Sequence, residues 1–323
     1  MTHVMGRLML IVNPRAGRRS VRENLPALRT ALDDAGLDHD VAETSGPGDA
    51  THLARKALQD GCRYLVAVGG DGTVHEVVNG MFTRNQGTPD TDGGAAPDEW
   101  EPVAPKAILA VASIGSGNDF IRTYGLDRKP EKLAAHFATH TILPTDVGVA
   151  SYTDGDGQRT ERLFANVASV GYPAEVVRKV SRMPRLLGRV RFLLGAYGGI
   201  LAMRRRPFTA VHLAHADVDR HVVALAVCNG QFFGGGMKVA PRALPDDGRF
   251  NTLVFSGGAS QLFLMTQQLH RGEHVPHPEI SEYQTPTVSL DPDVPLGVEA
   301  DGEYLGFTPV AFRLLPQALR LKI

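Results

Sequence analysis

Cysteine is scarce in this chain. Its 323 residues include two, Cys62 and Cys228, and both lie in or beside apolar runs. Thiols in such surroundings are typical of buried cysteines in a reducing compartment and not of a disulfide framework. The start of the sequence also lacks the charged region, apolar region and cleavage site that a secretory signal has in that order. We therefore expect a cytoplasmic protein whose fold depends on its core.

An excess of charge of either sign is missing as well. Lys and Arg total 34 and Asp and Glu total 35, so the formal net charge is -1 at pH 7. This balance excludes a strongly basic surface, and we expect no nucleic-acid partner. Long apolar runs are also missing, because the longest nearly uncharged stretch, 192–203, is too short and glycine-rich to span a bilayer.

Two common nucleotide-binding motifs are absent. No G-x-x-x-x-G-K-[ST] occurs, which excludes a P-loop NTPase, and no G-x-G-x-x-G follows the first predicted strand. The stretch 64–82, YLVAVGGDGTVHEVVNGMF, instead predicts a buried strand, a glycine loop and a helix with Thr73 as its N-cap. Such a loop directs N–H groups at an anion, and Asp71 within it suits Mg2+ beside phosphates. Taken alone, the stretch fits a structural glycine turn with a solvated Asp equally well.

The order of strand, glycine loop and helix recurs on both sides of this stretch. Leu8–Val12 precedes the loop 13–19, and Ala107–Ala112 precedes the loop 113–119. A strand at 39–43 and a helix at 50–59 complete an alternating pattern, which is typical of an open parallel sheet. The three loops then gather at the carboxyl ends of the strands, where ligands bind in this architecture. Their convergence favours a nucleotide site.

Beyond Leu143 the pattern changes from alternating strands and helices to mainly strands. Strands are predicted at Phe164–Val170, His221–Cys228, Arg249–Phe255, Thr287–Leu290 and Val310–Leu315. We expect an α/β domain at 1–143 and a mainly antiparallel β-sandwich at 144–323, with the closing segment 307–323 able to pair with either. Residues 83–105, rich in Gly, Pro, Asp and Thr, are interpreted as a surface loop without a core.

Together these motifs resemble the diacylglycerol kinase catalytic family, lipid kinases that include bacterial diacylglycerol kinases and sphingosine and ceramide kinases. The resemblance runs along nearly the whole chain. In order, it is carried by NPRAG (13–17), Thr44 before the turn at 48–50, GGDGTVHEVVNG (69–80), SIGSGNDF (113–120), NGQFFGGGMKVAP (229–241), PDDG (245–248) and VEADGE (298–303). The GGDGT segment alone is not specific, because NAD kinases share it and phosphofructokinases carry a related version.

The resemblance implies an NAD kinase- and phosphofructokinase-like first domain that binds ATP and Mg2+. The implied nucleotide-contacting residues are Asn13, Pro14, Arg15, Ala16, Gly17, Thr44, Gly70, Asp71, Gly72, Thr73, Val74, His75, Glu76, Ser116, Gly117 and Asn118. It implies a Mg2+ network that includes Asp71 and Asp119. It also implies a second, structural metal site at Asp247, completed by the carbonyl groups of Leu244 and Arg249.

The implied reaction is transfer of the ATP γ-phosphoryl group to a lipid hydroxyl, most simply that of diacylglycerol. Besides Asp71, the implied catalytic residues are Asp301 and Glu303 of the D-G-E motif. Either carboxylate could accept the hydroxyl proton, and we favour Glu303. Alternatives are a kinase of sphingosine, ceramide, monoacylglycerol or phosphatidylglycerol, a kinase of a soluble metabolite, and a nucleotide sensor without turnover.

The expected partners are ATP, a lipid at a membrane surface and, through an edge strand, a second copy of the chain. The segment 181–206 mixes Arg with Leu, Phe and Ile. It fits a helix that docks on anionic lipid, so that the protein is peripheral to the membrane, and it fits slightly better an amphipathic helix that covers the sheet. Three histidines, His270, His274 and His277, lie close in sequence, but prolines separate them and a metal site is disfavoured.

Overall fold

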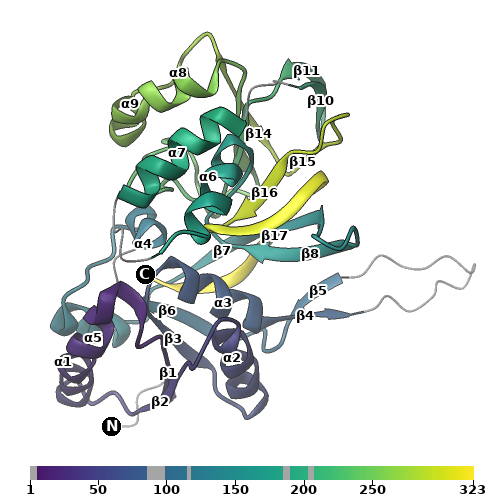
Figure 1. The fold of residues 1–323 in the computed structure, drawn as a ribbon. Helices are drawn as coiled ribbons and strands as arrows, with labels where there is room; N and C mark the ends of the chain where they lie inside the picture. Colours follow the sequence, from purple (N-terminus) through teal and green to yellow (C-terminus); the bar gives the residue numbers. More distant parts are fainter. Residues whose placement is uncertain (1–5, 86–98, 115–117, 185–189, 203–206) are drawn as a thin grey trace, which may run out of the picture. The chain divides into compact units, whose positions relative to one another are not determined.

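The computed structural model describes residues 6–85, 99–114, 118–184, 190–202 and 207–323 (Figure 1). The chain forms two compact units, and neither is one continuous segment. The first unit contains Met1–Ile121, Gly125–Pro144 and Ala318–Ile323. The second contains Arg122–Tyr124 and Thr145–Gln317.

The first unit is built on a parallel sheet, as the alternating pattern predicts. Its strand order is β2 (His39–Glu43), β1 (Leu8–Val12), β3 (Tyr64–Val68) and β6 (Ile108–Ala112). The last part of β17 (Glu303–Lys322) pairs in parallel with β6. The helical elements are η1 (Ala16–Arg19), α1 (Ser20–Asp34), α2 (Asp49–Gln59), α3 (Asp71–Met81), α4 (Asp119–Thr123) and α5 (Pro130–Phe137). Every residue of β3 and β6 is buried, which explains their uninterrupted apolar runs.

The register of this sheet brings the carboxyl ends of its strands to one level. Val12 pairs with Glu43 on one side and with Val68 on the other, and Val68 pairs with Ala112. Each of these residues is the last of its strand. The loops that follow the four strands therefore begin side by side at one edge of the sheet.

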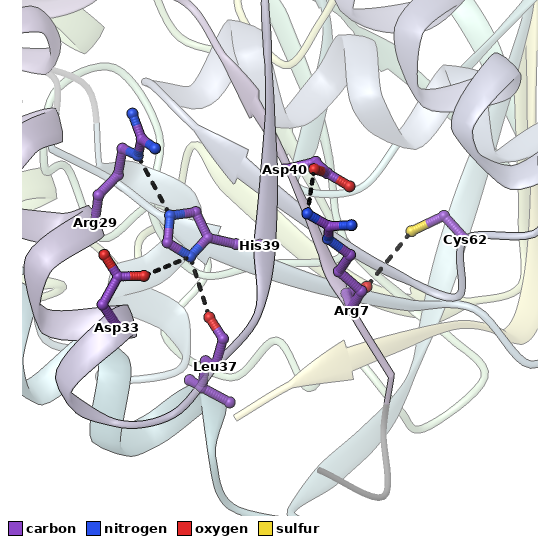
Figure 2. Close-up of polar contacts among 7 residues, drawn as sticks. All are labelled: Arg7, Arg29, Asp33, Leu37, His39, Asp40 and Cys62. Carbon is purple, nitrogen blue, oxygen red and sulfur yellow. Dashed lines mark hydrogen bonds and ion pairs between the residues drawn. The ribbon is translucent and has the colours of Figure 1, made fainter. Parts of the chain in front are cut away.

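The amino ends of the same strands are joined by polar contacts (Figure 2). Arg7, just before β1, forms an ion pair with Asp40 at 2.7 Å, and its carbonyl accepts a weak bond from the Cys62 thiol. His39 Nδ1 lies 3.1 Å from the Leu37 carbonyl, while Arg29 Nε donates to His39 Nε2 at 3.3 Å. The Arg7–Asp40 pair is largely exposed and therefore contributes little stability.

The segment 83–105 is not a plain loop, which corrects the prediction. Its ends form β4 (Phe82–Asn85) and β5 (Glu99–Pro102), which pair in an antiparallel ribbon (Figure 1). Phe82 is buried, and Val103 donates a backbone hydrogen bond to the Met81 carbonyl. The turn-forming composition between these strands obscured the ribbon.

The second unit is antiparallel and confirms the predicted β-sandwich. Its central order is β14 (Ile280–Thr285), β13 (Phe250–Phe255), β12 (Ala224–Cys228), β9 (Val167–Gly171), β16 (Gly297–Ala300) and β17. The remaining strands are β7 (Ile142–Thr153), β8 (Arg159–Phe164), β10 (Phe208–Leu213), β11 (Asp217–His221) and β15 (Thr287–Leu290). Its helices are α6 (Tyr172–Ser181), α7 (Val190–Ala202), α8 (Ala259–Leu264) and α9 (Thr266–Arg271). Phe164, Phe250 and Phe312 meet in its main core.

The predicted strand Phe164–Val170 is interrupted, which is a second correction. β8 ends at Phe164 and β9 begins at Val167. The backbone N–H groups of Ala165, Asn166 and Val167 point to the carboxylate of Asp301 instead of continuing one ladder. A side chain about 135 residues further along the sequence therefore sets this break.

Helix α7 differs from an amphipathic helix whose whole apolar face covers the sheet. Its glycine face packs on α6, where a Cβ at Gly195 would collide with Val180 and a Cβ at Gly199 would make a tight contact with Tyr172. Large apolar side chains on other faces are exposed to 49–65%: Leu193, Leu194, Tyr197 and Leu201. Within the described ranges, no helix combines the length and apolar character needed to cross a bilayer.

Candidate active site

Backbone hydrogen bonds extend the ladder of the first unit just past the ends of its strands. Asn13 N donates to the Val68 carbonyl at 3.0 Å, and Thr44 N donates to the Val12 carbonyl at 2.8 Å. Gly69 N donates to the Ala112 carbonyl at 3.2 Å. These bonds fix where each loop leaves the sheet, so the predicted nucleotide loops share one edge.

The central glycine loop is shaped by close packing at Gly69. A Cβ at this position would collide with the hydroxyl group and Cβ of Thr73, which is itself buried. Only glycine allows the strand to turn this tightly into α3. Gly70 precedes the helix with extended backbone, and Gly72 is exposed in its first turn.

Asp71 connects the central loop to the loop after β6. One of its carboxylate oxygens accepts the backbone N–H of Asp119 at 3.2 Å, and the other accepts that of Phe120 at 3.1 Å. Mg2+ usually binds one or two carboxylates together with substrate phosphates, so Asp71 with the adjacent Asp119 is a donor set that fits it.

His75 and Glu76 have structural partners within the first unit. His75 is buried, and the amide of Asn79 lies 3.4 Å from its Nε2. Glu76 Oε2 accepts the N–H of Ala50 at 3.0 Å in the first turn of α2, and the Thr51 hydroxyl donates to the Glu76 carbonyl. Glu76 therefore joins α3 to α2, whereas the His75 contact lies within α3.

The other predicted nucleotide residues lie in the loops at the same edge. Asn13 Oδ1 accepts the N–H of Arg15 at 3.1 Å, and its carbonyl accepts that of Ala16, so 13–16 form a compact turn. Pro14 and Gly17 flank Arg15 and Ala16 in this turn, and the Arg15 side chain is exposed. Val74 is buried in α3, and Asn118 is partly exposed. Ser116 and Gly117 lie outside the described residues.

In the second unit, Asp301 organises the D-G-E turn. It has a left-handed backbone, with φ of 50°, and Gly302 follows with φ of 84°. The Asp301 carboxylate accepts three backbone N–H groups, from Ala165 at 2.9 Å, Asn166 at 3.0 Å and Val167 at 3.1 Å. This side chain therefore connects the end of β16 to the break between β8 and β9.

Glu303 is in different surroundings from Asp301. Its side chain is 38% exposed, and its carboxylate lies 3.8 Å from the Arg162 guanidinium. The Glu303 carboxylate is thus partly open to solvent and paired with an arginine. The two carboxylates that the sequence could not distinguish thus have distinct settings.

Glu299 is a buried acidic residue of the same motif that sequence reasoning missed. Its Oε1 accepts the Ser169 hydroxyl at 2.5 Å, and its Oε2 accepts the Gly302 N–H at 3.0 Å. Burial raises the pKa of Glu299 to about 8, and the nearby charge of Asp301 adds to the effect. A single glutamate among the apolar residues Val298 and Ala300 was the available signal.

Asp146 is a second missed residue, close to the predicted structural metal site. Its carboxylate accepts the N–H of Gly248 at 2.8 Å and that of Gln317 at 2.7 Å. Burial raises its pKa, and Asp246 and Asp247 add to the rise. Asp247 accepts the Arg249 N–H at 3.0 Å, and Leu244 lies at the other end of this loop. The clustered negative charge and exposed loop fit a cation.

The three histidines have separate hydrogen-bond partners. Nδ1 of His270 lies 2.8 Å from the Thr266 carbonyl, and Nε2 of His274 lies 2.8 Å from that of Val239. His277 Nδ1 accepts the N–H of Glu279. In the part of the chain that the structure describes, no group of three or more His, Cys, Asp or Glu is arranged to hold a metal ion.

The two units correspond to two known domain families. Residues 7–150 match the diacylglycerol kinase catalytic domain, and residues 166–323 match the YegS C-terminal NAD kinase beta sandwich-like domain. The chain belongs to the diacylglycerol kinase family of lipid kinases. The resemblance inferred from the motifs is thereby confirmed.

Individual relatives of this lipid kinase are distant but match along the whole chain. It is 26% identical to a diacylglycerol kinase of Bacillus subtilis over 313 residues, 95% of this chain and 93% of the relative. It is 27% identical to a probable lipid kinase YegS-like of Pseudomonas syringae pv. tomato, with 98% and 93% covered. A solved structure of a putative diacylglycerol kinase from Bacillus anthracis shares the fold, with a TM-score of 0.72, 21% identity, and 98% and 97% coverage.

Proposed function

We propose that this lipid kinase transfers the γ-phosphoryl group of ATP to the hydroxyl group of diacylglycerol, which gives phosphatidic acid. The observation that carries the proposal is the sheet edge of the first unit, where Asp71 joins two glycine loops that begin at one level. This arrangement suits a polyphosphate and its cation. The relatives named diacylglycerol kinase support the choice of acceptor.

The first unit supplies the groups that would bind ATP and Mg2+. Backbone N–H groups of the loops after β1, β3 and β6 would hold the phosphates, and the exposed Arg15 adds positive charge. Asp71 and Asp119 would hold Mg2+. When bound, Mg2+ neutralises the charge of the transferred phosphoryl group.

The second unit supplies the proton acceptor. The lipid hydroxyl oxygen forms a bond to the γ-phosphorus, the bond from that phosphorus to the ADP oxygen breaks, and the hydroxyl proton passes to Glu303. Glu303 suits this role because its carboxylate is accessible, with Arg162 3.8 Å away. Asp301 is occupied by three backbone N–H groups and shapes the turn instead.

The loop 244–249 would hold a structural cation in the second unit. Asp247 supplies a carboxylate, and the carbonyl groups of Leu244 and Arg249 are oxygen ligands of the kind that Mg2+ and Ca2+ prefer. The buried Asp146 would support the site, because a cation offsets the repulsion among the neighbouring acidic groups.

The exposed apolar side chains of α7, together with Phe263 and Leu264 of the contacting helix α8, would dock on a membrane surface. We define this set as the α7–α8 surface: Leu193, Leu194, Tyr197, Leu201, Phe263 and Leu264. Lys179 lies against Gly198 of α7, and Arg182 at the end of α6 is exposed, so positive charge borders the surface. Apolar area beside positive charge is the pattern that binds anionic lipid interfaces.

Phosphoryl transfer from γ-labelled ATP with Mg2+ to a panel of lipids in mixed micelles tests the proposal. We expect label on diacylglycerol, loss of that label in Asp71→Ala, and full activity in Asp156→Ala, which changes an exposed turn in the second unit. Label on a sphingolipid or phosphatidylglycerol would keep the mechanism and replace the substrate. Bound ATP without label on any lipid would contradict the proposal.

A further inference from the structure

A buried hydrogen-bond connection lies directly beneath the D-G-E turn. Glu299 and Ser169 are paired residues on the adjacent strands β16 and β9. From this position, Glu299 Oε1 accepts the Ser169 hydroxyl and Oε2 accepts the Gly302 N–H. One carboxyl group therefore connects the centre of the sheet to the middle residue of the turn.

The turn needs such support because its backbone is strained. Asp301 is one of two described non-glycine residues with positive φ, and it is followed by Gly302, also with positive φ. Strained backbone of this kind persists only where surrounding contacts determine it, and it gathers at functional sites. The Asp301 carboxylate holds one side of the turn, and Glu299 holds the other through Gly302.

We propose that Glu299 is a positioning residue: its bonds to Gly302 and Ser169 fix the backbone from which Glu303 reaches the reacting hydroxyl group. The effect of Glu299 on catalysis rests on the proposed function, whereas its effect on the order of the turn does not. Glu299 is fully buried, so it does not touch the substrate itself.

The charge state of Glu299 is set by its surroundings. Asp301 follows it on the turn, the buried thiol of Cys228 on β12 interacts with it electrostatically, and Tyr304 is its register partner on β17. None of these groups is a cation, so the neutral acid is favoured below its raised pKa. The neutral acid can donate from Oε1 to the Ser169 hydroxyl while Oε2 still accepts from Gly302. A glutamine reproduces both bonds.

The first experiment measures hydrogen exchange of the peptide that contains residues 301–303 in the wild type, Glu299→Gln, Glu299→Ala and Ser169→Ala. We expect exchange at least about tenfold faster in Glu299→Ala, a smaller increase in Ser169→Ala, and protection retained in Glu299→Gln. Unchanged exchange in a folded Glu299→Ala would overturn the proposal. If Glu299→Ala does not fold, unchanged exchange in Ser169→Ala would overturn it.

The second experiment measures lipid phosphorylation in the same variants. Displacement of Glu303 should lower kcat about 10- to 100-fold in Glu299→Ala, with the KM for ATP within about twofold of the wild type. Glu299→Gln should recover most of kcat, and equal kcat in the Gln and Ala variants would reject positioning by these bonds. A wild type without activity on any lipid would refute the proposed function, whereas the exchange pattern would still decide the role of Glu299.

Discussion

Asp301 and Glu303 lie two residues apart, and the contacts of their carboxylates differ. Three backbone N–H groups donate to the Asp301 carboxylate, while the partly exposed Glu303 carboxylate forms an ion pair with Arg162 at 3.8 Å. Removing an acceptor from buried donors is costly, because each donor then lacks a partner. Removing one member of a partly exposed ion pair, such as Glu303, costs less.

We predict that Asp301→Ala lowers the free energy of unfolding by about 2–4 kcal/mol, since hydrogen bonds to charged groups are strong. Glu303→Ala should change it by less than about 1 kcal/mol while lowering turnover about 10²- to 10⁴-fold. Urea denaturation and lipid phosphorylation assays on both variants check this. A stable but inactive Asp301→Ala beside an active Glu303→Ala would exchange the two roles.

The buried Glu299 predicts a specific pH dependence of stability. Its pKa of about 8 in the folded chain lies above the ordinary value of 4.5, so between these pH values the folded state binds a proton that the unfolded state has lost. Stability from this group is therefore fully present below about pH 4.5 and falls as the pH rises toward 8. The glutamine side chain of Glu299→Gln does not titrate, so this pH dependence of stability is absent from that variant.

We therefore expect Glu299→Gln to gain stability relative to the wild type as the pH rises from 5 to 8.5. The gain should be on the order of a few kcal/mol, since one pKa unit corresponds to about 1.4 kcal/mol. Urea denaturation of both proteins at several pH values measures it. A difference that stays constant over this range would contradict the assignment.

At the scale of elements, α2 and α3 are held together through Gly80. A Cβ at this position would meet the Thr51 carbonyl and lie 2.7 Å from the Ala54 Cβ. We predict that Gly80→Ala destabilises the protein by about 1–3 kcal/mol through overpacking. Gly72→Ala, in the same helix with open space around it, is the matched control. Helix propensity alone would make both changes stabilising, so equal thermal midpoints would refute the packing argument.

The exposed apolar side chains of helix α7 predict binding to lipid vesicles. Changing Leu194 and Tyr197 together to Gln should reduce sedimentation with phosphatidylglycerol vesicles by about tenfold or more, because each large apolar side chain contributes roughly 1.5–3 kcal/mol when buried. Phe208→Gln removes an equally exposed aromatic side chain from β10 and serves as the control. Binding that depends on neither change would argue against docking by the α7–α8 surface.

The sequence predicts elements best where burial is uniform. Tyr64–Val68 and Ile108–Ala112 are buried at every residue, and their apolar runs locate the strands to within one residue. The prediction of one strand at Phe164–Val170 is wrong because the Asp301 carboxylate, distant in sequence, interrupts that strand. The predicted strand Val310–Leu315 is too short, because burial along the 20-residue strand β17 does not alternate regularly and the sequence pattern therefore hides its full length.

The same limit applies to the candidate site. The residues Asp71, Asp301 and Glu303 stand in recognisable motifs, so their positions can be predicted. Glu299 and Asp146 act through backbone N–H groups that only the fold brings near them. Their roles have no local signature in the sequence, because a buried acid in a strand is defined by its neighbours on other strands.

At the scale of the whole molecule, β17 contributes to both units. Residues 303–307 of β17 pair with Gly297–Ala300 of β16 in the second unit, whereas Arg320 and Leu321 pair with Ile108 and Leu109 of β6 in the first. Leu319 and Leu321 are buried, and Lys322 Nζ donates to the Thr139 hydroxyl and to the Thr141 carbonyl at 2.8 Å. The first unit therefore depends on residues that follow the whole second unit.

We predict that a chain ending at Gln317 loses ATP binding and cooperative unfolding, because the edge of β6 and its apolar neighbours become exposed. Leu321→Ala in the full chain is the milder comparison and should cost about 2–5 kcal/mol with ATP binding kept. Isothermal titration with ATP and thermal unfolding check both proteins. Normal ATP binding by the shortened chain would show that the final strand is dispensable.

This dependence sets an order of events during synthesis. The strands β1, β2 and β3 lie close in sequence and can pair while the ribosome is still translating the second half. The strand beside β6 is made more than 200 residues later, and the entropy of closing so large a loop delays its pairing. Until then the nascent chain presents an open strand edge, the feature through which chains aggregate. We therefore expect a chaperone that covers the unpaired edge of β6 to aid folding until Leu321 has been translated.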